Sequence, residues 1–102
     1  MALIISIDGV RTEIKGARDG KYLTVSQINI IVGGYFEYVC CDPEVTGGYD
    51  HFFCNENGKL KGLPINVEAT RLSTYTKEED VIVGNVVFCK SETNLNNEGE
   101  SI

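Results

Sequence analysis

The sequence predicts a single α+β domain, built from a small, mostly antiparallel sheet of about five strands with one or two short helices packed on it. Short runs of β-branched and aromatic residues, separated by turn residues, recur along the chain. One segment, residues 25–32, instead has helical spacing behind a capping box. The chain has 102 residues, which leaves room for one hydrophobic core.

The N-terminal segments predict a β-hairpin. Residues 2–7 form an apolar run that favours a strand, and Asp8-Gly9 is a dipeptide typical of tight turns. Residues 10–15 then alternate between apolar and charged side chains, which is typical of a strand with one solvated face. We therefore expect these two strands to pair.

A helix is expected next. Thr24 and Gln27 have the spacing of a capping box, and Gly33-Gly34 can adopt the left-handed conformation that ends a helix. The apolar residues between them at helical spacing are Val25, Ile28, Ile31 and Val32. Their β-branched side chains also suit a strand, so that alternative stays open.

The second half predicts three more strands and a second short helix. Strands are expected at residues 35–41, 51–55 and 80–90, the last interrupted by Gly84-Asn85. Residues 42–50 are expected to form a loop, and Asn57-Gly58 a turn. A short helix is indicated by the spacing of Ile65, Ala69 and Leu72, with Asn66 as its cap. The domain is expected to span residues 1–90, followed by an acidic, disordered tail at residues 91–102.

The charge balance argues against direct DNA binding. The chain carries 15 acidic and 9 basic residues, a net charge of −6, whereas DNA-binding domains are usually basic. No apolar run approaches the roughly 20 residues that span a bilayer, and no basic region precedes the apolar N-terminus. We expect a cytoplasmic protein, and the sequence leaves a homo-oligomer open.

The cysteines and the single histidine do not predict a catalytic or metal site. Cys40, Cys41, Cys54 and Cys89 lie in or beside expected strands, which favours free thiols. A zinc site would need an unusual set such as Cys41, His51, Cys54 and one further ligand. His51 and Cys54, three residues apart on a strand, should face opposite sides of the sheet. We expect a non-catalytic protein without a metal or cofactor.

Residues 55–71 are the strongest candidate for a binding site. They concentrate positive charge in an acidic chain, with neutral amides and an irregular backbone, and such loops are favoured places for binding. A neighbouring tyrosine could stack on a base. The candidate ligand-binding residues are Lys59, Lys61, Asn66, Arg71, Asn57, Tyr35 and Tyr38. The alternative is a solvated turn followed by a helix that Asn66 merely caps.

Three segments carry a resemblance to a known family. They are Ile31-Val-Gly-Gly-Tyr-Phe-Glu37, Asn55-Glu-Asn-Gly-Lys-Leu-Lys-Gly-Leu-Pro-Ile-Asn66 and Asp80-Val-Ile-Val-Gly-Asn-Val-Val87. Over residues 22–90 the chain resembles a family of small bacterial and phage proteins classed as a domain of unknown function. Because such relatives occur in phages, plasmids and conjugative elements, the resemblance implies an accessory or anti-defence role. It implies no catalytic residues.

Two hypotheses about function follow. In the first, the protein binds and sequesters a small anionic ligand, such as a nucleotide derivative, and so removes a host signal. In the second, its acidic surface blocks a host defence protein or a nucleic-acid enzyme. An enzyme is disfavoured because no activated nucleophile is evident.

Overall fold

Five strands form one antiparallel sheet in the computed structural model, which describes residues 2–20, 22–73 and 81–91. The strands are β1 (Ala2–Ile5), β2 (Arg11–Ile14), β3 (Phe36–Cys40), β4 (His51–Asn55) and β5 (Val86–Cys89). Their order is β2-β1-β5-β4-β3, and each neighbouring pair is antiparallel. The predicted α+β class and the hairpin of β1 with β2 are confirmed. Of the tail predicted at residues 91–102, residues 92–102 lie outside the described residues, as do residues 74–80.

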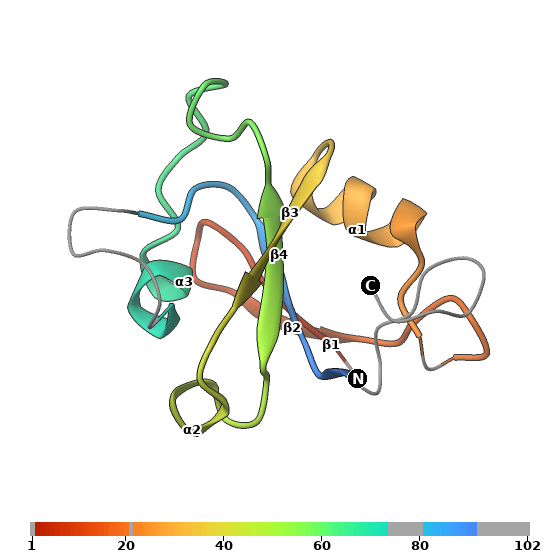
Figure 1. Cartoon of the computed structure of the whole chain (residues 1–102). Coiled ribbons are helices and arrows are strands. Elements are labelled where there is room, and N and C mark those ends of the chain that lie inside the picture. The colour runs from red at the N-terminus through yellow and green to blue at the C-terminus, as the bar shows by residue number, and fades with distance from the viewer. Residues whose placement is uncertain (1, 21, 74–80, 92–102) are drawn as a thin grey trace.

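Two helices lie on opposite faces of the sheet, α1 (Val25–Val32) on one and α3 (Val67–Leu72) on the other (Figure 1). Both were predicted. Residues 42–50 were predicted to be a loop, and this was wrong in part because they contain α2 (Pro43–Thr46). Asp42 caps this short helix by accepting a hydrogen bond from the Glu44 amide, and proline suits its first position.

The α1 helix begins and ends as its sequence predicts. The Thr24 side chain accepts a hydrogen bond from the Gln27 amide at 3.1 Å, and the Gln27 side chain accepts one from the Thr24 amide. At the other end Gly33 has φ 81°, a left-handed conformation that favours glycine. Ile28 and Val32 are buried against the sheet. Capping at both ends and burial against the sheet therefore both stabilise this helix.

The core consists of two apolar clusters, one on each face of the two central strands. Every residue of β4 and β5 is buried. On the α3 side the rings of Phe52 and Phe88 stack with centroids 4.9 Å apart, and on the α1 side Phe53 and Val87 are fully buried. Because both faces are covered, these strands have apolar runs and not an apolar–polar alternation.

A buried asparagine ties α3 to this core. Asn66 is fully buried, and its Oδ1 accepts a hydrogen bond from the Ala69 amide at 3.0 Å. Its Nδ2 donates to the carbonyls of Ile5 at 2.9 Å and Gly84 at 3.0 Å. The side chain thus caps a helix and joins the end of β1 to the residues before β5.

We predict that Asn66→Ala lowers the free energy of unfolding by about 3 kcal/mol. The substitution removes a helix cap, worth about 1 kcal/mol, and leaves two buried carbonyls without their donor. Urea unfolding measures the change. Asn57→Ala is the matched control, because the Asn57 side chain is exposed, and it should stay within about 0.5 kcal/mol of wild type. Equal stabilities of the two variants would contradict this role of Asn66.

Candidate functional site

Two of the three basic residues of the 55–71 segment, Lys59 and Lys61, lie in a hydrogen-bonded turn between β4 and α3. The Lys61 amide donates to the Asn57 carbonyl at 2.9 Å, and the Leu63 amide donates to the Gly58 carbonyl at 3.0 Å. At Gly58 an added Cβ would lie 2.7 Å from a methyl group of Val83, so only glycine fits there without a shift. The turn is therefore held in one conformation by hydrogen bonds and by close packing.

Asn55, the last residue of β4, fastens this turn to α1. Its side chain is buried, with 5% of the residue exposed. Nδ2 donates to the Val32 carbonyl at 3.0 Å, and Oδ1 accepts from the Asn57 amide at 2.8 Å. One side chain therefore satisfies an orphan carbonyl at the end of α1 and begins the turn. The sequence analysis did not identify this residue.

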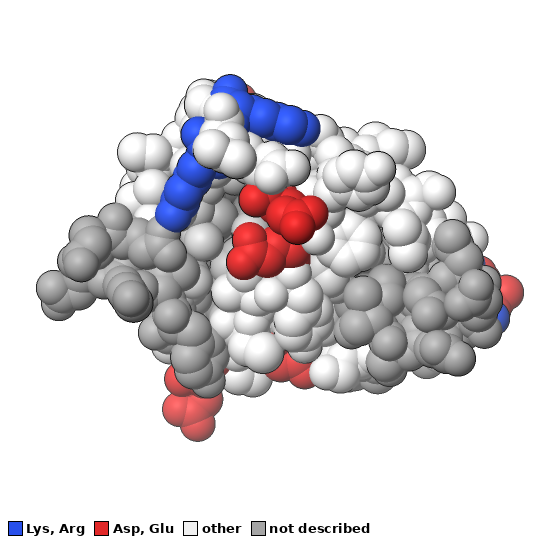
Figure 2. Space-filling view, turned by 45° about the horizontal axis from the view of Figure 1, so that its top comes forward, with Lys and Arg blue, Asp and Glu red and all other residues white. Residues whose placement is uncertain are grey.

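The turn and the end of α1 bring four of the candidate residues to one end of the molecule. A Cβ at Gly34 would lie 3.1 Å from Lys61 Nζ, so the ammonium group lies over this glycine. Tyr35 follows directly, is 75% exposed, and accepts a hydrogen bond from the Glu56 amide through its carbonyl. The four residues are Lys59, Lys61, Asn57 and Tyr35. Figure 2 shows the basic side chains gathered on this face.

Acidic side chains lie next to these lysines, as Figure 2 also shows. Glu56 is exposed beside Asn57, and Glu37 is exposed on β3 opposite Cys54, one residue from Asn55. They lower the local positive potential and so limit the charge that a ligand can carry here. The arrangement can hold one small anionic group more readily than an extended polyanion.

The other three candidate residues lie elsewhere. Asn66 is buried and its hydrogen bonds serve the fold, as described above. Arg71 lies on α3, which Figure 1 shows well apart from the 57–62 turn, and pairs with Glu68. That hydrogen bond, with a second from Arg11, holds the pKa of Glu68 below its usual value against the opposing effect of burial. Tyr38, in the middle of β3, stacks on His51 of β4, with ring centroids 4.9 Å apart.

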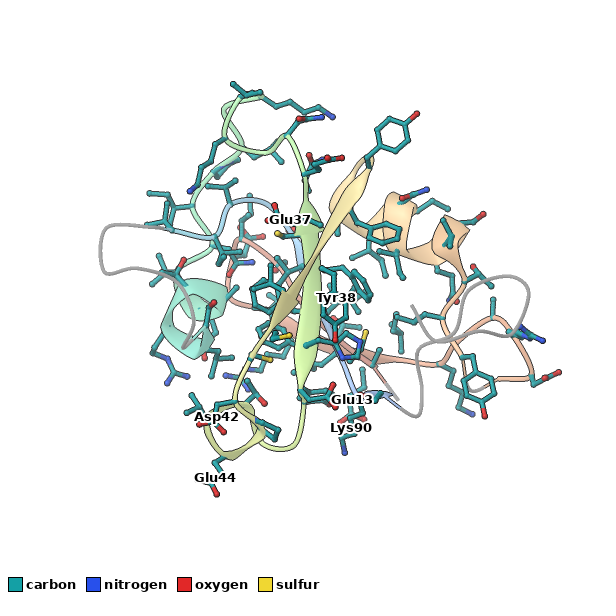
Figure 3. All side chains as sticks on the ribbon, viewed as in Figure 1. Glu13, Glu37, Tyr38, Asp42, Glu44 and Lys90 are labelled. Atoms are coloured by element: carbon teal, nitrogen blue, oxygen red, sulfur yellow. The ribbon has the colours of Figure 1, made fainter. Side chains whose placement is uncertain are left out.

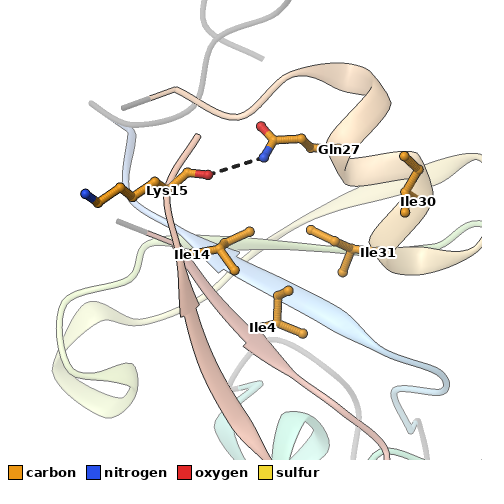
Figure 4. Close-up of a pocket in the computed structure, with 6 residues that line it drawn as sticks. All are labelled: Ile4, Ile14, Lys15, Gln27, Ile30 and Ile31. Atoms are coloured by element: carbon orange, nitrogen blue, oxygen red, sulfur yellow. Dashed lines mark hydrogen bonds between the residues drawn. The ribbon is translucent and has the colours of Figure 1, made fainter. Parts of the chain in front are cut away.

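An apolar hollow of about 330 Å³ lies between α1 and the hairpin of β1 with β2 (Figure 4). Its lining residues are Ile4, Ile14, Lys15, Gln27, Ile30 and Ile31. The Gln27 amide is engaged, because Nε2 donates to the Lys15 carbonyl and Oε1 accepts from the amides of Ala17 and Thr24. The hollow can take an apolar group, but it offers few polar groups to select one.

His51 does not lie on the same face of the sheet as Cys41 or Cys54. Asp50 accepts hydrogen bonds from His51 Nδ1 and from the Ser91 hydroxyl, so the carboxylate lies between the serine and the histidine. In a catalytic triad the histidine takes that central place. Cys41 and Cys54 belong to the α3-side cluster, whereas His51 contacts Phe53 on the α1 side, as the alternation predicts.

Burial also disfavours ionisation of two of the thiols. Burial is the main reason that the pKa of Cys41 and that of Cys89 are raised to about 12, and nearby Asp50 contributes to both shifts. Neither is a thiolate at neutral pH, so neither is an activated nucleophile. Among residues 2–20, 22–73 and 81–91, no three histidine, cysteine or acidic side chains gather in a way that could hold a metal ion. The described helices are also too short or too polar to cross a membrane.

Comparison with family models assigns the chain to a family. A model described as a domain of unknown function, DUF3846, matches residues 2–101. The chain belongs to the DUF3846 family. The comparison with curated proteins and the comparison with solved structures gave no significant match. The DUF3846 match extends beyond the residues 22–90 over which the sequence motifs suggested a domain of unknown function, and it includes the β1–β2 hairpin.

We predict that one of the four thiols of native protein reacts rapidly with an aromatic disulfide reagent. Cys40 is exposed, whereas Cys41, Cys54 and Cys89 are buried. The other three should react only after denaturation, giving four in total. The absorbance of the released thiolate gives both counts. A total below four in freshly purified protein would mean that some of the cysteines are oxidised.

We also predict that Asp50 stabilises the fold above about pH 4. Burial acts to raise its pKa, but hydrogen bonds from Ser91 and His51 outweigh burial and lower it. Since the folded pKa lies below the unfolded one, the stability from ionised Asp50 is lost as the pH falls through the folded pKa. Asp50→Asn should be less stable than wild type at neutral pH, and the difference should shrink in acid. Urea unfolding across the acid range tests this, and a difference independent of pH would contradict it.

Proposed function

We propose that this DUF3846 protein is a non-catalytic binding protein that sequesters a small anionic ligand, such as a nucleotide derivative. The ligand binds where the 57–62 turn meets the end of α1. Lys59 and Lys61 receive the anionic group, Asn57 offers a side-chain amide, and Tyr35 stacks on the base.

The position of the Lys61 ammonium group over Gly34, the residue before the exposed Tyr35, is the observation that supports this proposal. Nucleotide recognition combines a cation for the phosphate with an aromatic ring for the base. Here both come from short, rigid segments, since Asn55 joins the turn to the end of α1. Such preorganisation lowers the entropy that is lost when a ligand binds.

A cellular role follows as part of the same proposal. The protein acts in the cytoplasm of a bacterial cell and is carried by a phage or another mobile element. Removing a nucleotide-derived signal of the host would give such an element an anti-defence function without any catalytic step. Sequestration needs affinity and abundance, and it does not need an activated nucleophile.

A second candidate is inhibition of a host protein through the acidic surface. Glu13, Asp42 and Glu44 lie toward the end of the molecule opposite the 57–62 turn, at the bottom of Figure 3. Glu13 and Glu44 are exposed, and Asp42 is partly exposed. A basic site on a defence or nucleic-acid enzyme would complement these carboxylates, and its binding would weaken steeply with added salt.

We predict that Lys61→Ala folds normally but binds its nucleotide ligand about ten- to a hundred-fold more weakly. A charge-assisted contact contributes about 1.5–3 kcal/mol to binding, whereas an exposed lysine adds little to folding. Thermal shift with a panel of mono-, di- and cyclic nucleotides identifies the ligand, and calorimetry gives both affinities.

Arg71→Ala is the matched control, because it also removes one exposed cation but lies on α3. It should bind as wild type does. Equal affinities of wild type and Lys61→Ala would remove the turn from the site. A chain that binds no nucleotide, yet captures a basic host protein at low salt only, would support inhibition in place of sequestration.

A further inference from the structure

The β3 strand forms an edge of the sheet and pairs only with β4 among the described strands (Figure 1). At one end of this ladder the Cys41 amide donates to the Asp50 carbonyl, and at the other the Glu56 amide donates to the Tyr35 carbonyl. Along an antiparallel strand, the backbone N–H and C=O groups of successive residues point alternately toward the neighbouring strand and away from it. Phe36, Tyr38 and Cys40 therefore direct their amides and carbonyls away from the sheet.

This edge lacks the protection that the other edge has. On β2 the exposed charged side chains of Arg11 and Glu13 discourage pairing with a further strand. On β3 the only charged residue is Glu37, and the remaining four are aromatic, β-branched or cysteine. Tyr38 is 45% exposed at the centre of the strand. An exposed edge of this composition is suited to pairing with another strand.

We propose that β3 pairs with β3 of a second copy of this chain, antiparallel about a two-fold axis at Tyr38. The two five-stranded sheets then form one continuous sheet, with both α1 helices on one face. Tyr38 lies opposite the partner's Tyr38, Phe36 opposite the partner's Cys40, and Glu37 opposite the partner's Val39. The outward groups of Phe36, Tyr38 and Cys40 provide the new hydrogen bonds.

The side chains favour this register over its neighbours. Residues whose backbone groups point outward must lie opposite one another in the two copies. The register can therefore shift only in steps that keep these residues opposite one another. A two-fold axis at Glu37 would put the two glutamates directly opposite each other, which is unfavourable. An axis at Val39 would shorten the overlap of the two strands. The axis at Tyr38 pairs all five residues and makes an aromatic cross-strand pair.

The charges at the two ends of β3 favour an antiparallel second copy as the occupant. The 57–62 turn, at the Tyr35 end, carries Lys59 and Lys61, and the Cys40 end carries Glu44 on α2 and Asp42, which caps that helix. In Figures 1 and 3 the turn and α2 lie at opposite ends of the strand and on the same side of the sheet. A two-fold axis perpendicular to the sheet exchanges the two ends of β3 and keeps both turns on one side of the sheet. Lys59 and Lys61 of each copy therefore approach the acidic α2 end of the other, with Glu37 and Glu56 reducing the net charge at the lysine end.

This inference goes beyond the proposed function and does not depend on it. The dimer forms through backbone groups and Tyr38, whether or not a ligand binds at Lys61. It places two ligand sites on one sheet, one toward each end of the shared β3 pair.

Sedimentation of the wild-type chain over a concentration series tests the dimer. We expect a species of twice the 11.2 kDa chain mass that dissociates on dilution. Amide hydrogen exchange by NMR tests the surface. Phe36, Tyr38 and Cys40 amides should exchange at least about tenfold more slowly in the dimer than in the monomer. Glu37 and Val39, whose amides face β4 in both states, are internal controls.

Tyr38→Lys tests the register, because it puts two lysines directly opposite each other. We expect this variant to be a folded monomer by circular dichroism and sedimentation. Thr12→Lys, the same charge on the β2 edge, should remain a dimer. The proposal is overturned by a wild-type chain that is monomeric throughout, by a Tyr38→Lys dimer, or by unprotected Phe36, Tyr38 and Cys40 amides in a wild-type dimer. If Tyr38→Lys does not fold, the wild-type exchange pattern decides.

Discussion

The side chain of Asn55 connects the hydrophobic core to the loop that carries the basic residues. It lies at the end of β4, where the buried strand leaves the core, and bonds the Val32 carbonyl and the Asn57 amide. A buried amide without partners would destabilise the fold by a few kcal/mol, so these bonds fix the side chain and with it both segments. Lys61 and Tyr35 keep their relative positions because each follows a segment that Asn55 holds.

The rest of the structure makes this constraint possible. Phe52, Phe53, Val87 and Phe88 fill both faces of the central strands, so β4 is a rigid base from which the turn extends. Asn66 has a parallel role at the other end of the 55–66 segment, where it joins α3 to Ile5 and Gly84. The turn is thus fixed at both ends by a buried asparagine, while its own side chains at Lys59 and Leu60 remain exposed.

Elements whose determinants are local could be predicted from the sequence. The capping box of Thr24 and Gln27 gave α1 with its exact bounds, and Asn66 was identified as the cap of α3. The two tertiary bonds of Asn66 could not be predicted, because their acceptors lie 61 and 18 residues away in the chain. The position of β5 between β1 and β4 could not be predicted for the same reason, because the strands that pair with it are distant in the chain. The helix α2 was missed although Asp42, Pro43 and Gly47 are the residues that begin and end a helix.

The candidate site shows the same division. That Lys59 and Lys61 lie together could be predicted from the sequence, because neighbours in a short turn stay together, whereas Arg71 lies apart from them on α3. Asn55 was correctly predicted as the last residue of a strand, but the bonds of its side chain to Val32 and Asn57 could not be predicted.

The most direct test of the binding site is an NMR titration of the wild-type chain with the nucleotide that gives the largest thermal shift. Our account predicts that the largest chemical-shift changes map to Gly34, Tyr35 and residues 57–61, and that Asn66 and Arg71 change little. Changes centred on Ile14 and Ile31 would place the ligand in the apolar hollow. That result, or the absence of any change with every nucleotide, would contradict the account.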